Sequence, residues 1–223
     1  MIKLTIAEIA QMLWKAAYET FIMVSWSLLA GLIFGTLIGL VLFLMSNQFF
    51  FKNKIINSIA NFIVNATRSI PFLILMVTVL PLGALLVDTA VGPKAVILPL
   101  SIAAIAFYAR LAENAFSQID KGVIEAAVAS GASHIRIIFG ILFPEAMAQL
   151  IRHATVTTIS LISFSSMAGV VGGGGIGDLA ISYGYQRYVT EVLILCVVIL
   201  IFIVMVIQYL GDKLANHFDK SYK

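Results

Sequence analysis

A long apolar run without a charge, residues 21–51, constrains the fold more than any other feature. It far exceeds the apolar region of a cleavable signal peptide, which is about 7–15 residues long. A helix that crosses a bilayer needs about 20 apolar residues, and we place this first span at residues 20–45. Because only 11% of the residues are charged, against about 25% in soluble domains, we expect an all-α integral membrane protein.

Four further apolar segments give a prediction of five transmembrane helices in total. They cover residues 55–87, 95–111, 154–171 and 192–211. Pro71 lies within the first of them and is expected to kink it or to begin a new helix, because proline lacks a backbone N–H. We assign residues 16–211 to one transmembrane domain. An interfacial helix within residues 1–19 precedes it, and a cytoplasmic tail, residues 212–223, follows it.

The basic residues predict the orientation, because cytoplasmic loops of membrane proteins carry an excess of Lys and Arg. Five spans put the two ends of the chain on opposite sides of the membrane. If residues 112–153 are cytoplasmic, ten basic residues are inside and four are outside, so the N-terminus is outside and the C-terminus inside; the orientation does not depend on Arg68. The inner ten are Lys52, Lys54, Arg68, Arg110, Lys121, Arg136, Arg152, Lys213, Lys220 and Lys223, and the outer four are Lys3, Lys15, Lys94 and Arg187.

Three glycines of the first span, Gly31, Gly35 and Gly39, are spaced four residues apart. This spacing puts them on one helical face, where another backbone can approach closely. The alternative is that they face lipid, as glycines in membrane helices often do. We favour close packing against a second helix.

Several kinds of chemistry are not supported by the sequence. The run Gly172–Gly177 is not a Walker A loop, because no Lys follows a Gly anywhere in the chain,. We interpret the run as a flexible break at a helix end, followed by a mobile polar loop at residues 178–191. The separated histidines His134, His153 and His217 do not predict a metal site. The basic pI fits loops at a membrane surface and not nucleic-acid binding.

Residues 119–146 are too charged to cross a bilayer and lie between apolar segments. Small and apolar side chains around Ala126 and Ala127 would form a short helix able to enter a groove on a partner, with Glu125 offering a charge. Gly131 would free the turn into a second short helix. From composition alone, an amphipathic helix resting on the membrane is an equal alternative.

The order Glu125-Ala126-Ala127, Gly131 and Pro144-Glu145-Ala146 resembles the signature of membrane subunits of binding-protein-dependent ABC importers. Phe143, where that family usually has Leu, and Lys121-Gly122 are mild departures. The resemblance extends from about residue 12 to residue 215, and further segments are similar to the methionine-importer branch. These segments are Arg68-Ser69-Ile70-Pro71-Phe72, Ala109-Arg110-Leu111-Ala112-Glu113, Ser166-Met167-Ala168-Gly169, the Gly172–Gly177 run and Tyr183-Gly184-Tyr185.

The resemblance implies a membrane-spanning subunit, itself not an enzyme, of an ATP-driven methionine importer in the plasma (inner) membrane of a prokaryote. It implies a homodimer of this chain, two ATP-binding subunits that hold ATP and Mg, and an extracytoplasmic substrate-binding protein. This chain would bind no cofactor itself. Its cytoplasmic coupling helices, between the third and fourth spans, would dock on the ATPase through Glu125, Ala126, Ala127, Gly131, Ala132 and His134.

The fourth span is our candidate for the lining of a solute path, because Thr157, Ser160, Phe164 and Met167 follow helical spacing,. The hydroxyls would meet a polar solute, and Met167 would form a soft gate. The alternative is that these hydroxyls bond to carbonyls of their own helix.

Three other functions remain open: an ABC permease for a different amino acid, a self-sufficient secondary carrier, and a membrane scaffold. A proton-coupled carrier would more typically show an ionisable group at mid-membrane, whereas the acids near these spans lie at loop edges. Dependence on a separate ATPase would distinguish the first of these functions from the other two.

Overall fold

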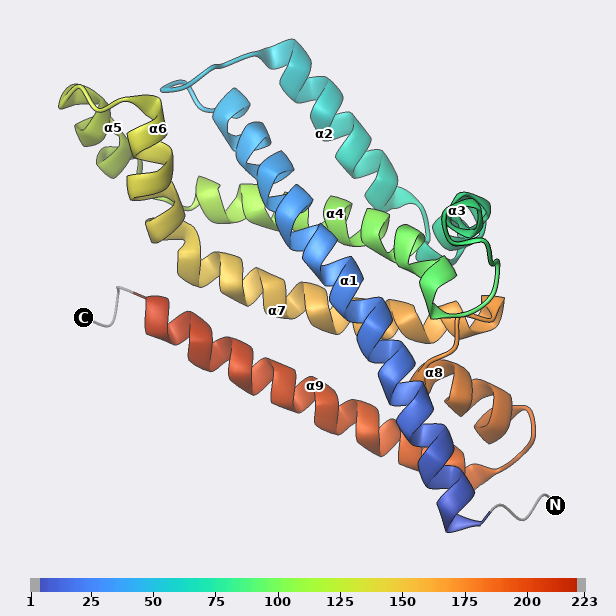
Figure 1. Cartoon of the computed structure of the whole chain (residues 1–223). Coiled ribbons are helices and arrows are strands. Elements are labelled where there is room, and N and C mark those ends of the chain that lie inside the picture. Colours follow the sequence, from blue (N-terminus) through green and yellow to red (C-terminus); the bar gives the residue numbers. More distant parts are fainter. Residues whose placement is uncertain (1–4, 220–223) are drawn as a thin grey trace.

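A computed structural model describes residues 5–219, and every regular element within that range is helical (Figure 1). The predicted all-α class is therefore confirmed. Four stretches are long and apolar enough to cross a membrane, and a bent pair of helices makes five if it counts as one span. The helices are α1 (Ile6–Ser46), α2 (Lys54–Ser69), α3 (Phe72–Val87), α4 (Pro93–Ser117), α5 (Lys121–Ala129), α6 (His134–Ile137), α7 (Phe143–Ala168), α8 (Ile176–Leu179) and α9 (Thr190–Phe218).

Helix α1 differs from the prediction, because it joins the expected interfacial helix and the first span without a break. Its 41 residues extend about 61 Å at about 1.5 Å per residue, roughly twice the thickness of a bilayer core. The backbone N–H of Thr5 donates to the carboxylate of Glu8 at 2.7 Å, which fixes the start of the helix. No proline lies between there and Ser46 to end it,.

The expected kink at Pro71 is confirmed as a sharp bend between α2 and α3. The two helices meet at 104°. Ile70 adopts the extended backbone that a following proline favours, and Pro71 forms the N-cap of α3,. The predicted second span is thus two helices of 16 residues each, about 24 Å long apiece.

Helices α1 and α4 cross closely along the glycine face of α1. A Cβ added to Gly31 would lie 2.9 Å from the Cβ of Ala104, and one added to Gly39 would lie 2.5 Å from the carbonyl oxygen of Ala109. A Cβ added to Gly35 would lie 3.1 Å from the backbone nitrogen of Ala109. The hydroxyl of Ser27 also donates to the carbonyl of Ile97 at 3.3 Å. In this structure the three predicted glycines face another helix of the same chain.

One interpretation of the C-terminal third is wrong, and one helix extends further than the expected span. The expected mobile loop at residues 178–191 is largely helical, since α8 leads directly into a π-helical turn at residues 180–185. Helix α9 continues seven residues past Gly211 to Phe218, into the predicted tail. Gly211 allows this continuation because it lies against Thr155 of α7, where a larger residue would not fit. Beyond it, Arg152 pairs with Asp219 at 3.0 Å.

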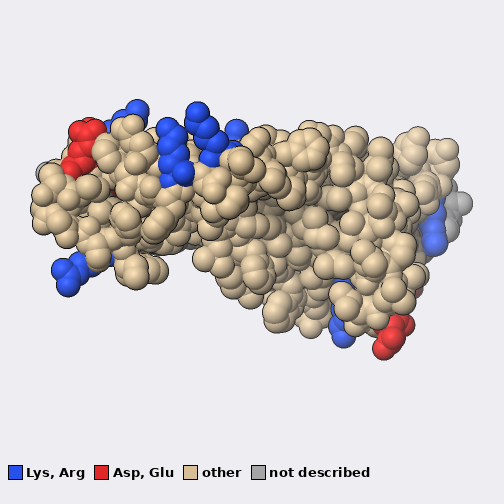
Figure 2. Space-filling view, turned by 90° about the horizontal axis from the view of Figure 1, so that it is seen from above, with Lys and Arg blue, Asp and Glu red and all other residues tan. Residues whose placement is uncertain are grey.

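Figure 1 shows the start of α1 and the end of α9 at opposite ends of the molecule, with α5 and α6 far from the N-terminal part of α1. Helix α8 lies beside that N-terminal part. Figure 2 shows charged side chains gathered toward the two ends, with a broad uncharged stretch between them. This distribution suits a protein whose middle is surrounded by lipid.

Candidate functional site: coupling helices and solute path

Helix α5 is a short, well-capped helix that stands out from the spans. The carboxylate of Asp120 caps its N-terminus by accepting from the backbone N–H of Gly122 at 2.6 Å. Ile124 is 1% exposed and Ala127 is 9% exposed, and both pack into a core with Phe43, Phe116 and Leu142. This pairing of residues three apart anchors one face of α5 to α1, α4 and the segment before α7.

The C-terminus of α5 ends in a Schellman motif at Gly131. The backbone N–H of Gly131 donates to the carbonyl of Val128 at 3.0 Å, and that of Ala132 donates to the carbonyl of Ala127 at 3.2 Å,. Gly131 has φ +76°, which L-residues with a side chain adopt only with strain,. Glycine is therefore required for the turn that separates α5 from α6.

The predicted coupling residues fall into two groups. Glu125, Ala126, Gly131 and His134 are exposed, whereas Ala127 is buried and Ala132 is half-buried. Ala127 thus belongs to the anchor rather than to the surface. The exposed face of the loop also carries apolar side chains. Val123 and Val128 belong to the short helix that was expected to enter a groove on a partner, whereas Ile135 and Phe139 were not expected as coupling residues.

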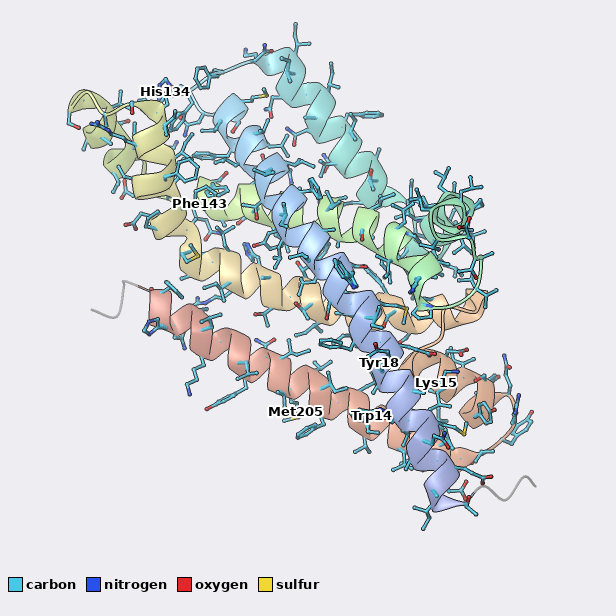
Figure 3. The ribbon with its side chains drawn as sticks, in the orientation of Figure 1. Trp14, Lys15, Tyr18, His134, Phe143 and Met205 are labelled. Atoms are coloured by element: carbon cyan, nitrogen blue, oxygen red, sulfur yellow. The ribbon has the colours of Figure 1, made fainter. Side chains whose placement is uncertain are left out.

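A contact that the sequence did not predict supports α6. The His134 ring lies 5.6 Å from the Phe50 ring and 5.0 Å from the Phe51 ring, measured between centroids. Both phenylalanines belong to the connection between α1 and α2, and Figure 3 shows His134 beside that connection. The loop is therefore held by the spans on one side and by this connection on the other.

Helix α7 presents a different set of side chains from the predicted path. Thr157 is 1% exposed and points into the protein, whereas Met167 is 47% exposed. Ser160 and Phe164 are half-buried, and the Phe164 ring stacks on Phe72 of α3 at 4.5 Å. The four residues therefore do not share one exposed face.

The hydroxyls of α7 bond to their own helix, as the alternative interpretation expected. Thr157 donates to the carbonyl of His153 at 2.8 Å, and Ser160 donates to that of Val156 at 2.9 Å,. The residues of α7 and its C-terminal turn that are exposed at helical spacing are Val156, Ser163, Met167 and Val170.

At the other end of the molecule, α1 caps α8 with two side chains. The backbone N–H of Gly175 donates to the Glu19 carboxylate and that of Ile176 donates to the Thr20 hydroxyl, both at 2.9 Å. Gly174 and Gly175 reach this position with φ values of +77° and +94°. The glycine run is thus a fixed turn locked onto α1, which its spacing alone could not reveal.

Acidic side chains meet at this turn. Asp178 lies near Glu19, and burial, followed by the Glu19 charge, raises the pKa of Asp178,. Lys15 lies 3.9 Å from the Glu19 carboxylate. Arg187 stacks over the Tyr183 ring at 4.1 Å. Figure 3 shows Lys15 with Trp14 and Tyr18 on the same stretch of α1, close to α8.

Comparison with known proteins supports the family resemblance. Residues 31–223 match the family model described as "Binding-protein-dependent transport system inner membrane component". The Bacillus subtilis methionine import system permease protein MetP is 45% identical over 208 residues, covering 93% of this chain and 94% of that protein. The Vibrio cholerae protein named probable D-methionine transport system permease protein MetI is 40% identical over 210 residues, covering 94% and 93%.

Solved structures agree with these relatives. A structure described as inward facing conformations of the MetNI methionine ABC transporter superposes with a TM-score of 0.92 at 34% identity, covering 97% of this chain and 100% of that one. An amino acid ABC transporter with histidines gives a TM-score of 0.77 at 16% identity over 97% and 100%, a likeness of fold alone.

Proposed function

The chain belongs to the family of binding-protein-dependent transport system inner membrane components, and from this premise we propose that it is the membrane-spanning subunit of an ATP-driven methionine importer. The assignment of methionine as the substrate rests on sequence identity of 40–45%, along nearly the whole chain, with permeases named for methionine. The TM-score of 0.92 with the MetNI transporter supports the same assignment. ATP hydrolysis then belongs to a separate subunit, and this chain supplies the path.

The loop of residues 119–146 is the proposed site of coupling to that ATPase. Its support is an exposed face with Glu125 and Ala126 on a helix whose opposite face is anchored at Ile124. A rigid anchor lets a movement of the partner reach the spans rather than deform the loop. Closing of two ATP-binding subunits on ATP would tilt the spans and open the path to each side in turn.

A second copy of this chain completes the proposed path. Met167 and its exposed neighbours on α7 are apolar or hydroxyl-bearing. Two copies facing each other would place two such faces around one route, with a Met167 pair as the gate. An extracytoplasmic binding protein would deliver L-methionine, D-methionine or both to the end of the molecule that carries α8.

Uptake of labelled methionine tests this function. Cells lacking the chain are compared with cells in which it is restored, with each unlabelled amino acid added in excess as a competitor. We expect restored uptake that unlabelled methionine competes best and that disappears when the ATP-binding subunit is inactivated. Uptake that persists without that subunit would indicate a self-sufficient carrier. Competition mainly by another amino acid would keep the importer and change its substrate.

A further inference from the structure

A cavity of about 310 Å³ lies at the bend between α2 and α3. Residues of α4 and α7 complete its lining, so four elements meet at this half-open cavity. Its lining includes the polar side chains of Thr67 and Arg68 and the aromatic rings of Phe72, Phe107 and Phe164. A cavity with mainly apolar walls and a few convergent polar groups is the usual form of a small-molecule site.

The cavity lies near the middle of the membrane-spanning part. Arg68 is fourteen residues after Lys54, the first residue of α2, which puts it about 21 Å along the helix. The wall supplied by α4 includes Phe107, close to the middle of a 25-residue span. From the sequence we counted Arg68 among the inner basic residues, whereas the length of α2 puts it within the span, and it is exposed in the single chain. A charged residue at such a depth is costly and is by default a functional candidate.

Arg68 takes part in none of the ion pairs found among residues 5–219. Two other arginines of the spans behave differently. Arg110 lies 2.6 Å from the Glu113 carboxylate and 2.8 Å from the Asn61 amide oxygen, and Arg152 pairs with Asp219. The contact found for Arg68 is weaker, with its guanidinium carbon 6.0 Å from the centre of the Phe107 ring,.

The broken helix adds a second polar feature to the same cavity. Pro71 is the N-cap of α3 and provides no side-chain hydrogen bond to the helix start. Backbone N–H groups at an uncapped start favour a negative group nearby. The aromatic walls form the apolar counterpart, since Phe72 and Phe164 stack at 4.5 Å with planes 15° apart.

We propose that this cavity is a substrate subsite in which Arg68 binds the carboxylate of the transported amino acid. An arginine guanidinium matches a carboxylate through two parallel hydrogen bonds. The side chain of an apolar amino acid then lies against the aromatic walls, and a thioether makes favourable contacts with such rings. This inference rests on the proposed function and adds to it a recognition site in the membrane, separate from that of a binding protein.

The test is binding of radiolabelled L-methionine to the purified complex of this chain with its ATP-binding subunits, without the binding protein. Binding to the ATP-binding subunits alone is subtracted. The variants are Arg68→Gln, Arg68→Lys and, as a matched control, Lys54→Gln, which removes one positive charge from the exposed start of the same helix. The competitors are methioninamide, which lacks the carboxylate charge, and norleucine, which keeps it and lacks the sulfur.

We expect Arg68→Gln to weaken methionine binding by about tenfold or more, as loss of a charge-assisted hydrogen bond does. Arg68→Lys should retain part of the affinity, and Lys54→Gln should bind as the unmodified complex does. Norleucine should compete in the unmodified complex and methioninamide should not. If Arg68→Gln prevents assembly of the complex, the competition by norleucine and methioninamide and the affinity of Arg68→Lys still test the subsite.

Two results would overturn the subsite. One is equal methionine affinity in Arg68→Gln and Lys54→Gln, and the other is competition by methioninamide as strong as that by norleucine. Neither result bears on methionine uptake by the restored cells, so the proposed importer function would stand without this site. Failure of the unmodified chain to restore methionine uptake would instead remove the proposed function itself.

Discussion

At the scale of single residues, Glu125 is an exposed charge that takes no part in the core of the fold. It lies on the outer face of α5, beside the small side chain of Ala126, while Ile124 holds the opposite face. A substitution at Glu125 therefore changes what a partner meets and leaves the core untouched. Exposed substitutions of this kind usually alter stability by less than about 0.5 kcal/mol.

We predict that Glu125→Arg abolishes methionine uptake while membrane insertion stays normal. Reversing the charge at the centre of a docking helix puts like charges together, or leaves a buried charge unpaired, when the ATPase binds. Uptake of labelled methionine and the amount of chain in isolated membranes are measured together. The control is Glu191→Arg, the same reversal on an exposed residue at the far end of the molecule. ATP-dependent uptake at the normal rate in Glu125→Arg would disprove the coupling role of Glu125.

At the scale of elements, the glycines of α1 illustrate what a sequence can and cannot indicate. Four-residue spacing predicts one face, and Gly31, Gly35 and Gly39 do lie on one face. It does not identify the neighbour, because contact of α1 with α4 depends on matching small residues such as Ala104 and Ala109 far along the chain. Helix contacts in membranes are set by such shape matching more than by any local signal.

We predict that Gly39→Ala destabilises the protein by about 1–3 kcal/mol, the usual cost of overpacking. The added methyl would lie 2.5 Å from the Ala109 carbonyl oxygen and 2.8 Å from the Glu113 nitrogen, so backbone must move. Thermal unfolding of the purified complex measures the change. Gly140→Ala is the control, because a Cβ there meets nothing within 4 Å. Equal unfolding temperatures for the two variants would contradict the close crossing of α1 and α4.

The glycine turn before α8 is a second case in which long-range contacts decide the structure of an element. The run of glycines indicates a break in the helix, and the break is present. Glu19 and Thr20 accept hydrogen bonds from this turn, and each lies 156 residues before its donor in the sequence. No local pattern reveals such a pair, which explains why residues 178–191 were expected to form a mobile loop.

The acidic pair at this turn predicts a pH-dependent stability. Burial and the charge of Glu19 raise the pKa of Asp178 above its ordinary value of 3.8. Because the pKa of this carboxyl is higher in the folded than in the unfolded protein, its protonation stabilises the fold. This stabilisation is fully present at a pH below the unfolded-state pKa and is lost as the pH rises through the folded-state pKa. At neutral pH the ionised Asp178 is therefore a cost to the fold.

We accordingly expect Asp178→Asn to raise the unfolding temperature of the complex at neutral pH. The gain should shrink as the pH falls toward 3.8, because the native carboxyl is then also uncharged. Thermal unfolding over a pH series measures the difference between the variant and the unmodified complex. Asp212→Asn, at an exposed carboxyl of α9, serves as the control. A gain that is the same at every pH would exclude the proposed electrostatic cause.

At the scale of the whole molecule, the sequence predicts the membrane-spanning segments better than the residues of the candidate solute path. Uncharged runs of sufficient length identify the spans, and the ordered signature around Glu125 and Pro144 identifies the family. The residues of a path are harder to find, because helical spacing does not say which face remains open. Thr157 and Met167 both lie on α7, yet one is buried against neighbouring helices and the other is exposed. Such a distinction depends on the position of every neighbouring helix.

The open face of α7 leads to a prediction about the assembled transporter. If two copies place these faces around one path, a cysteine at position 167 should lie close to its equivalent in the second copy. The natural Cys196 is buried and is replaced by Ala to give a background without a reactive thiol. We expect Met167→Cys in that background to yield a cross-linked dimer with a short bifunctional thiol reagent in native membranes. The yield should change when ATP is trapped on the ATPase, because the gate moves between the two access states.

Phe202→Cys on α9, also exposed but on a different helix, is the control and should remain monomeric. Dimers from position 202 and none from position 167 would mean that the two copies meet through another face, and Met167 could not form the gate.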